Sequence, residues 1–160
     1  MISSLSVAAQ DCKFKKNEVD EFTKQKVLET KQETLSKSGT FYSAITAKKI
    51  NDQRILEVYF SSLSLFSLYE GKTLMLLTDK GDVIELKFPE SKVSDRLYNS
   101  AAKTTTWFQT QYFPLNDDTY RKLLSSKINK VRVNSSDGYI DSEVKDKWWK
   151  KDQELLKCIE

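Results

Sequence analysis

The stretch TLMLLTDKGDVIELKF, residues 73–88, decides the fold class of this 160-residue chain. Two apolar runs, TLMLLT and VIELKF, enclose the polar segment Asp79-Lys80-Gly81-Asp82. A glycine among polar residues between two apolar runs is a β-hairpin signal. The stretch therefore predicts two antiparallel strands joined by a tight turn.

Strand patterns continue on both sides of this hairpin, marked by two-residue alternation and by β-branched or aromatic residues. Further strands are predicted at 27–35, 41–50, 54–63, 63–69, 104–113 and 130–133. Pro114 is expected to stop the strand at 104–113. Residues 10–24 are expected to form an irregular lead-in with a turn of helix at 18–22, and residues 89–103 a polar loop.

A short helix is predicted at NDDTYRKLLSSK, residues 116–127, with Asn116 or Asp117 as its cap. Its apolar stripe has helical spacing and consists of Tyr120, Leu123 and Leu124.

An amphipathic helix is predicted at SEVKDKWWKKDQELLKCIE, residues 142–160, with Asp141 or Ser142 as its cap. The face that it buries is expected to carry Val144, Trp148, Leu155 and Ile159. The order of elements predicts an α+β fold, in which an antiparallel β-sheet of about six or seven strands packs against a short helix and a C-terminal amphipathic helix.

The first nine residues, MISSLSVAA, carry no charge, whereas the next stretch is dense with it. Val7-Ala8-Ala9 fits the small-residue end of a secretory signal, with cleavage before Gln10. We therefore expect residues 1–9 to be a signal-peptide remnant and residues 10–160 a single α+β domain in a periplasmic or secreted protein. The alternative is the mildly apolar N-terminus of a cytoplasmic protein. The sequence contains no run of about 18 apolar residues, so no transmembrane segment is predicted.

The two cysteines, Cys12 and Cys158, lie near the two ends of the chain. In an exported protein they are expected to form a disulfide, and in a cytoplasmic protein they would be unrelated thiols. A zinc site needs three or four ligands, and the chain has two cysteines and no histidine. The net charge of +3 is too mild to indicate a nucleic-acid partner.

The absence of histidine removes the commonest general base and the usual serine triad. No phosphate-binding glycine loop or dinucleotide fingerprint is present, and no cofactor is predicted. Catalysis by two carboxylates stays open, because sequence spacing cannot place such a pair. Residues 79–82 and 137–141 contain the Asp and Gly of a calcium loop but not its regular ligand run, so they favour turns.

Three aromatic residues are candidates for a contact surface. Trp107 and Tyr112, on one predicted strand, would either line a sugar- or peptide-binding groove or pack across the strands. Trp149 is expected on the shoulder of the last helix, where it would cover the sheet edge or form part of a contact patch, while Trp148 faces the core.

The segments at 73–86 and 112–141, followed by the closing amphipathic helix, resemble a recurring kind of small exported bacterial protein that is uncharacterised. The resemblance covers residues 73–160 and implies a periplasmic or secreted location in a Gram-negative bacterium, but no activity and no functional residue. We interpret the chain as a non-enzymatic binding or interaction module of the cell envelope, with a protein or glycan partner. The alternatives are a carboxylate-based hydrolase and a carbohydrate-binding accessory domain.

Overall fold

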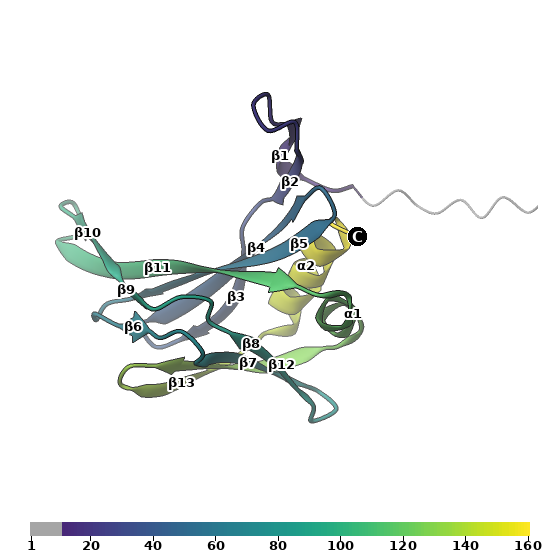
Figure 1. Ribbon diagram of the computed structural model, residues 1–160. Coiled ribbons are helices and arrows are strands. Elements are labelled where there is room, and N and C mark those ends of the chain that lie inside the picture. The colour runs from purple at the N-terminus through teal and green to yellow at the C-terminus, as the bar shows by residue number, and fades with distance from the viewer. Residues whose placement is uncertain (1–10) are drawn as a thin grey trace, which may run out of the picture.

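Antiparallel strands make up most of the computed structural model, which describes residues 11–160 (Figure 1). The proposed signal remnant at 1–9 lies outside the described residues. The strands are β1 (Phe14–Val19), β2 (Lys26–Thr30), β3 (Glu33–Ser38), β4 (Phe41–Ile50), β5 (Gln53–Ser62), β6 (Ser67–Leu68), β7 (Thr73–Thr78), β8 (Val83–Lys87), β9 (Lys92–Val93), β10 (Asp95–Asn99), β11 (Thr104–Leu115), β12 (Ile128–Ser135) and β13 (Gly138–Glu143). The helices are α1 (Asp117–Ser125) and α2 (Asp146–Lys157).

The strands form two main sheets rather than the single sheet that the sequence predicts. The larger sheet has seven strands in the order β1-β2-β4-β5-β11-β10, with β3 also paired to β4. The smaller sheet has four strands in the order β13-β12-β7-β8, and β6 pairs with β9 in a separate two-stranded ribbon. The antiparallel pairing and the two helices of the predicted α+β fold are thus confirmed, while the division between sheets is not foreseen.

The core lies between the two sheets. Alternation along β5 turns Leu56, Val58 and Phe60 inward, where each is at most 3% exposed. The smaller sheet supplies the opposing apolar side chains, which include Leu74, Leu76, Val131 and Val133. Both helices pack at one end of the two layers, and α2 contacts β3, β4 and α1 (Figure 1).

The predictions with the strongest local signals are confirmed. The β7–β8 hairpin forms as expected, and Gly81 takes the positive φ of +88° that its turn requires. Strands β4 and β5 match the runs predicted at 41–50 and 54–63 almost residue for residue. Helix α1 is capped by Asn116, whose side-chain oxygen accepts a hydrogen bond from the Thr119 N–H at 2.8 Å.

The N-terminal predictions at 10–24 and 27–35 are wrong in detail. Residues 14–19, expected as irregular lead-in, form strand β1 because they pair with β2, and the turn of helix expected at 18–22 is absent: residues 18 and 19 end the strand, and 21–23 form a turn. The strand expected at 27–35 divides into β2 and β3, which pair with different parts of β4. At the break, the Ala47 N–H donates to the Thr30 hydroxyl at 3.0 Å, so the side chain replaces a missing ladder bond.

Pro114 does not stop its strand, because β11 runs on to Leu115. Strand β10 pairs only with residues 104–108 of β11, so at Pro114 the strand has a neighbour, β5, on one side only. A proline is tolerated there because its missing N–H leaves no gap in a second ladder.

Two regions predicted as loop, turn or helix start contain strands. Residues 89–103 hold β9 and the fully exposed β10, and residues 138–143 form β13. Conversely, most of the strand expected at 63–69 is irregular, with only the short β6 in it. Asp141 and Ser142 therefore belong to β13, and α2 begins later than predicted, with Lys145 at its N-cap and no side-chain cap bond.

A disulfide between Cys12 and Cys158 closes the chain on itself, as predicted for an exported protein. Its Cα atoms lie 5.7 Å apart, and the two cysteines are separated by 146 residues. Cys12 precedes β1 and Cys158 is the C-cap of α2, so the bond fastens the β1–β2 arm to the last helix.

We expect the double variant Cys12→Ser/Cys158→Ser to lose about 2–5 kcal/mol of unfolding free energy, because the cross-link restricts the unfolded chain. Urea denaturation of the variant and of the wild type measures this loss. Wild-type protein under reductant is the matched control and should show the same loss. Equal midpoints for oxidised wild type and variant would contradict the expectation.

Candidate functional site

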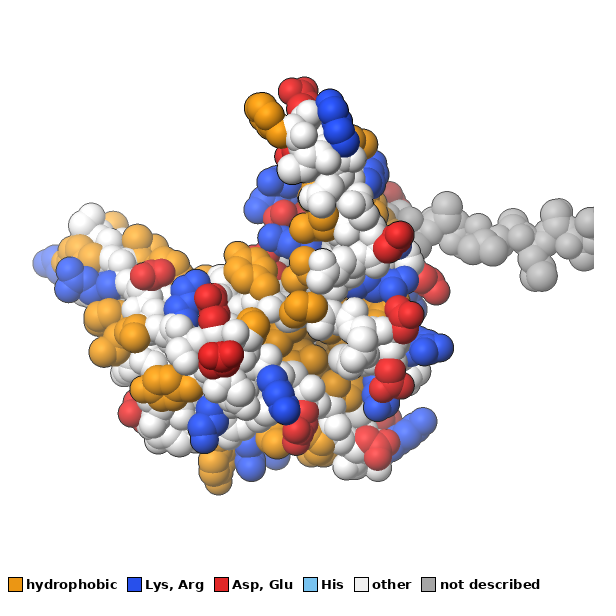
Figure 2. Space-filling model, in the orientation of Figure 1, with side chains coloured by type: hydrophobic (Ala, Val, Ile, Leu, Met, Phe, Trp, Pro, Cys, Tyr) orange, Lys and Arg blue, Asp and Glu red, His pale blue; other side chains and the backbone are white. Residues whose placement is uncertain are grey.

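One face of the larger sheet is left open and forms the candidate site. Within residues 11–160, neither helix lies on the face that points away from the smaller sheet (Figure 1). We call this the outer face; it carries side chains from β2, β4, β5, β11 and β10, namely Glu29, Tyr42, Lys48, Glu57, Tyr59, Leu97, Phe108 and Tyr112. Figure 2 shows the molecular surface hollowed between the β1–β2 arm and the β10 end.

An aromatic row crosses three strands of the outer face. Tyr42, Tyr59 and Phe108 lie on β4, β5 and β11, with ring centroids 6.3 Å and 6.2 Å apart in succession. All three side chains are half-buried. The Tyr42 hydroxyl lies 3.1 Å from the Thr34 hydroxyl of β3, which sets the direction of its ring. Leu97 of β10 shares this face and extends the apolar strip toward the sheet edge.

A row of alternating charges runs beside the aromatic row. Lys15 of β1 contacts Glu29 of β2 at 3.1 Å, and Lys48 of β4 bridges Glu29 at 3.6 Å and Glu57 of β5 at 2.5 Å. The Lys48 ammonium also lies 5.4 Å from the centre of the Tyr112 ring, within cation–π range. The charge row therefore links four strands and ends against an exposed aromatic side chain.

The contacts of the charge row favour the ionised forms of Glu29 and Lys48 despite their partial burial. Burial raises the pKa of Glu29, but the Lys15 hydrogen bond and the Lys48 charge outweigh it and hold that pKa below its usual value. Burial lowers the pKa of Lys48, but its contact with the Glu57 carboxylate outweighs this and raises the pKa overall. The outer face thus offers fixed charges next to fixed aromatic rings.

Trp107 and Tyr112 do not line one groove. They are five residues apart on β11, so their side chains point to opposite faces of the sheet. Trp107 packs against the core, and Tyr112 is 45% exposed on the outer face. Of the pair, only Tyr112 belongs to the candidate site.

The assignment of the tryptophans on α2 is reversed relative to the prediction. Trp149 is 3% exposed and donates its indole N–H to the Ser126 carbonyl at 2.8 Å, so it forms no contact patch. Trp148 takes the half-buried position, with the Lys145 ammonium 4.9 Å from its ring centre. Val144, which the prediction counted in the buried stripe, lies before the helix, and the buried stripe of α2 runs through Trp149, Asp152 and Leu156.

Sequence reasoning missed the residues Tyr42, Tyr59 and Phe108 as a group. The signal that could have found them is aromatic residues at the positions of alternating strands that should face solvent. In β5, for example, Tyr59 lies between the inward-facing Val58 and Phe60.

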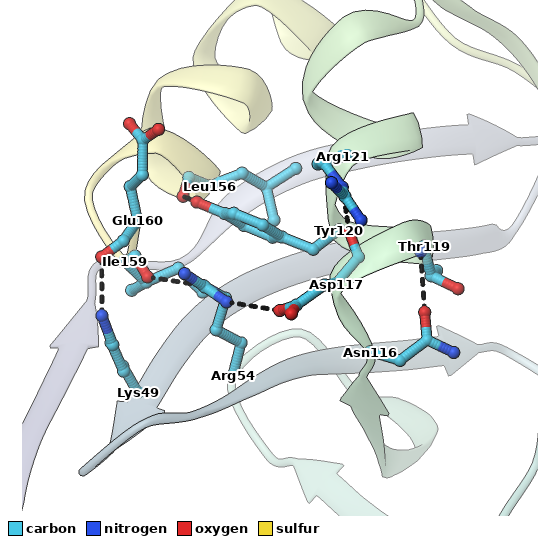
Figure 3. A network of polar contacts seen from close by, with 10 residues as sticks. All are labelled: Lys49, Arg54, Asn116, Asp117, Thr119, Tyr120, Arg121, Leu156, Ile159 and Glu160. Carbon is cyan, nitrogen blue, oxygen red and sulfur yellow. Dashed lines mark hydrogen bonds and ion pairs between the residues drawn. The ribbon is translucent and has the colours of Figure 1, made fainter.

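A second polar cluster, around Arg54, anchors the end of α2 (Figure 3). Arg54 stacks over Tyr120 at 4.3 Å, donates to the Ile159 carbonyl at 3.1 Å and pairs with Asp117. Tyr120 donates its hydroxyl to the Leu156 carbonyl at 2.6 Å. These bonds reach a carbonyl of the last turn of α2 and one just beyond it, so the cluster is a structural anchor for the end of the chain.

Comparisons with protein-family models, with curated proteins and with solved structures found no match to this chain. In the described part of the chain, no group of three or more His, Cys, Asp or Glu residues could hold a metal ion. None of the helices in residues 11–160 has the length and apolar character to cross a membrane. The function is therefore argued from the geometry of the outer face.

The most perturbed carboxyl of the described residues, Asp152, is closed off from solvent. It lies on the buried stripe of α2 with 0% exposure, and neither carboxyl oxygen has a hydrogen-bond partner. Burial raises its pKa to about 8; the negative charge of Glu33 on β3 adds to this effect, and Lys151 opposes it. The carboxyl is thus protonated at neutral pH and out of reach of a substrate.

Asp152 should make the protein less stable as pH rises. Between pH 3.8 and about 8 the unfolded carboxyl loses its proton while the folded one keeps it. The free energy of unfolding therefore falls by up to about 1.4 kcal/mol per pH unit across that window. The variant Asp152→Asn has no titrating group at this position. Its free energy of unfolding, measured by urea denaturation, should therefore rise relative to that of the wild type from pH 5 to pH 8. Parallel stability curves for the two proteins would show that Asp152 is ionised when folded.

Proposed function

We propose that this protein is a non-enzymatic binding module of the cell envelope and that the outer face is its contact surface. The observation that carries the proposal is the open aromatic row of Tyr42, Tyr59 and Phe108 on a hollowed sheet face. Rigid aromatic rings offer large contact area at low entropic cost, and exposed patches of this kind are typical of interaction sites.

The neighbouring charge row supports a partner with polar as well as apolar groups. Lys48 and Glu57 stand beside Tyr112 at fixed positions, so hydrogen bonds and ring contacts are available side by side. An extended glycan or a protein segment of the envelope has this mixed chemistry. The aromatic row also favours a second candidate, a carbohydrate-binding accessory domain, since sugar rings present apolar faces that can lie against aromatic rings.

A carboxylate-based hydrolase is less well supported. Its best candidate for a general acid at neutral pH is Asp152, whose raised pKa would suit the role. Asp152 lies on the buried face of α2 with no exposure to solvent, whereas a general acid must reach the bond that it protonates.

Photo-crosslinking in cells tests the contact surface. A photoreactive phenylalanine analogue in place of Tyr112 should give a covalent adduct with the partner, because that side chain is exposed on the outer face. The matched control is the same substitution at Tyr139, which is 62% exposed on β13 of the smaller sheet. Phe108→Ala should reduce the Tyr112 adduct about tenfold, the equivalent of about 1.4 kcal/mol. Adducts at neither position, or equally at both, would contradict the assignment of the outer face.

Two features support the export part of the proposal. The Cys12–Cys158 disulfide is typical of oxidising compartments. The resemblance of residues 73–160 to small exported bacterial proteins points the same way.

Intact mass of protein made from its native locus, alkylated with and without reductant, tests the export. We expect a mass that begins at Gln10 and no alkylation until the disulfide is reduced. A mass that begins at Met1, with two freely alkylated thiols, would place the protein in a reducing compartment.

A further inference from the structure

We propose that two copies of this chain associate edge to edge through β10, in an antiparallel strand pair centred on Leu97. Strand β10 is the last strand of the larger sheet and pairs with β11 on one side only. All five of its residues are exposed, with Leu97 at 61% and Tyr98 at 60%. Among the described residues, no strand pairs with the outward side of β10. An exposed edge of this kind is a template for another strand.

Two other edge strands, β1 and β8, carry charged side chains at exposed positions. Strand β1 ends the larger sheet at its other side with the sequence FKKNEV, and β8 ends the smaller sheet with VIELK. Their exposed positions carry several charged side chains, which natural edge strands use to prevent pairing. The sequence of β10, DRLYN, also begins with two charged residues, but it places the large side chains of Leu97 and Tyr98 side by side at its centre and just after it.

The charges of β10 disfavour two registers of self-pairing and are compatible with the one centred on Leu97. An antiparallel pair centred on Leu97 puts Leu97 opposite its own copy, Arg96 opposite Tyr98, and Asp95 opposite Asn99. No like charges then face each other, and each Arg96 lies opposite an aromatic side chain of the other copy. Pairs centred on Asp95 or Arg96 would place like charges directly opposite each other.

A contact between Arg and Tyr of the kind this register needs already occurs inside the chain. On the smaller sheet, the Arg132 guanidinium lies 4.0 Å from the centre of the Tyr139 ring on the neighbouring strand. In the proposed dimer, Arg96 and Tyr98 share the face opposite Leu97 and would form two such contacts by symmetry.

Further apolar side chains surround the start of β10 and would enlarge the interface. Leu63 and Leu65 follow β5, and Val93 ends β9; each is more than half exposed. The Ser94 N–H donates to the Phe66 carbonyl at 2.9 Å, which ties these segments together next to Asp95. Figure 2 shows hydrophobic side chains gathered at this end of the molecule. A five-residue strand pair is short on its own, so this added area is what a stable dimer requires.

The partner is a second copy because one symmetric contact satisfies both open edges at once. A two-fold pair is closed, so it leaves no free β10 edge for further growth. The inference does not rest on the proposed binding function, because the association needs no ligand.

Light scattering or sedimentation of the purified full chain tests the association. We expect a mass twice the 18.5 kDa of the chain, falling to the single-chain value on dilution. Leu97→Lys should give the single-chain mass at all concentrations, with unchanged circular dichroism because the side chain is exposed. The matched control, Val83→Lys on the edge strand β8, should keep the doubled mass. A wild-type monomer at every concentration, or a dimer that Leu97→Lys leaves intact, would overturn the proposal.

Cysteine cross-linking tests the register. Under mild oxidation Leu97→Cys should cross-link to its own copy, since centred residues on paired strands lie within disulfide reach. Arg96→Cys alone should not, but a mixture of Arg96→Cys and Tyr98→Cys should give a mixed dimer. Efficient cross-linking of Arg96→Cys to itself, with none for Leu97→Cys, would overturn the proposed register.

Discussion

The apolar core shared by the two sheets is the constraint on which the rest of the structure depends. The inward side chains of β5 need a second layer, and β7 and β12 of the smaller sheet provide it. Each fully buried Val, Leu or Phe is worth about 1.5–3 kcal/mol, so few other interactions compete. Because the helices pack at the end of these layers, they do not cover the opposite face of the larger sheet. The open outer face is thus a consequence of how the core is built.

Elements whose signal is local could be predicted from the sequence, and elements that depend on a distant partner could not. The glycine turn of the β7–β8 hairpin lies within a few residues of the strands that it joins. The Asn116 cap likewise lies directly before α1. Strand β10 has no alternation to reveal it, because it is exposed on both faces and exists only by pairing with β11. The division into two sheets likewise depends on which strands pair with each other, and alternation along a single strand does not contain that information.

The candidate site was missed because some side chains were not assigned to the correct face of their strand or helix. Alternation assigns residues to two faces, so an odd separation, as between Trp107 and Tyr112, already excludes a common groove on a flat strand. On α2, the predicted stripe was phased on Val144, which lies before the helix, and this put Trp148 rather than Trp149 in the core. Which face stays uncovered depends on where helices pack, and that information is not local to any strand.

The shape of the outer face is linked to the compartment through the disulfide. The β1–β2 arm borders the hollow, yet β2 pairs with β4 over only three residue pairs, from Val27–Ile50 to Glu29–Lys48. Beyond this ladder, the arm is held by hydrogen bonds of Thr30 to Ala47 and of Lys26 to Asn51, by the Lys15–Glu29–Lys48 contacts, and by the bond between Cys12 and Cys158. In a reducing compartment the disulfide would be lost, and only hydrogen bonds and ion pairs would hold the β1–β2 arm beside the hollow. A contact surface bounded by this arm is therefore best suited to an oxidising environment, which connects the binding proposal and the export proposal by one physical cause.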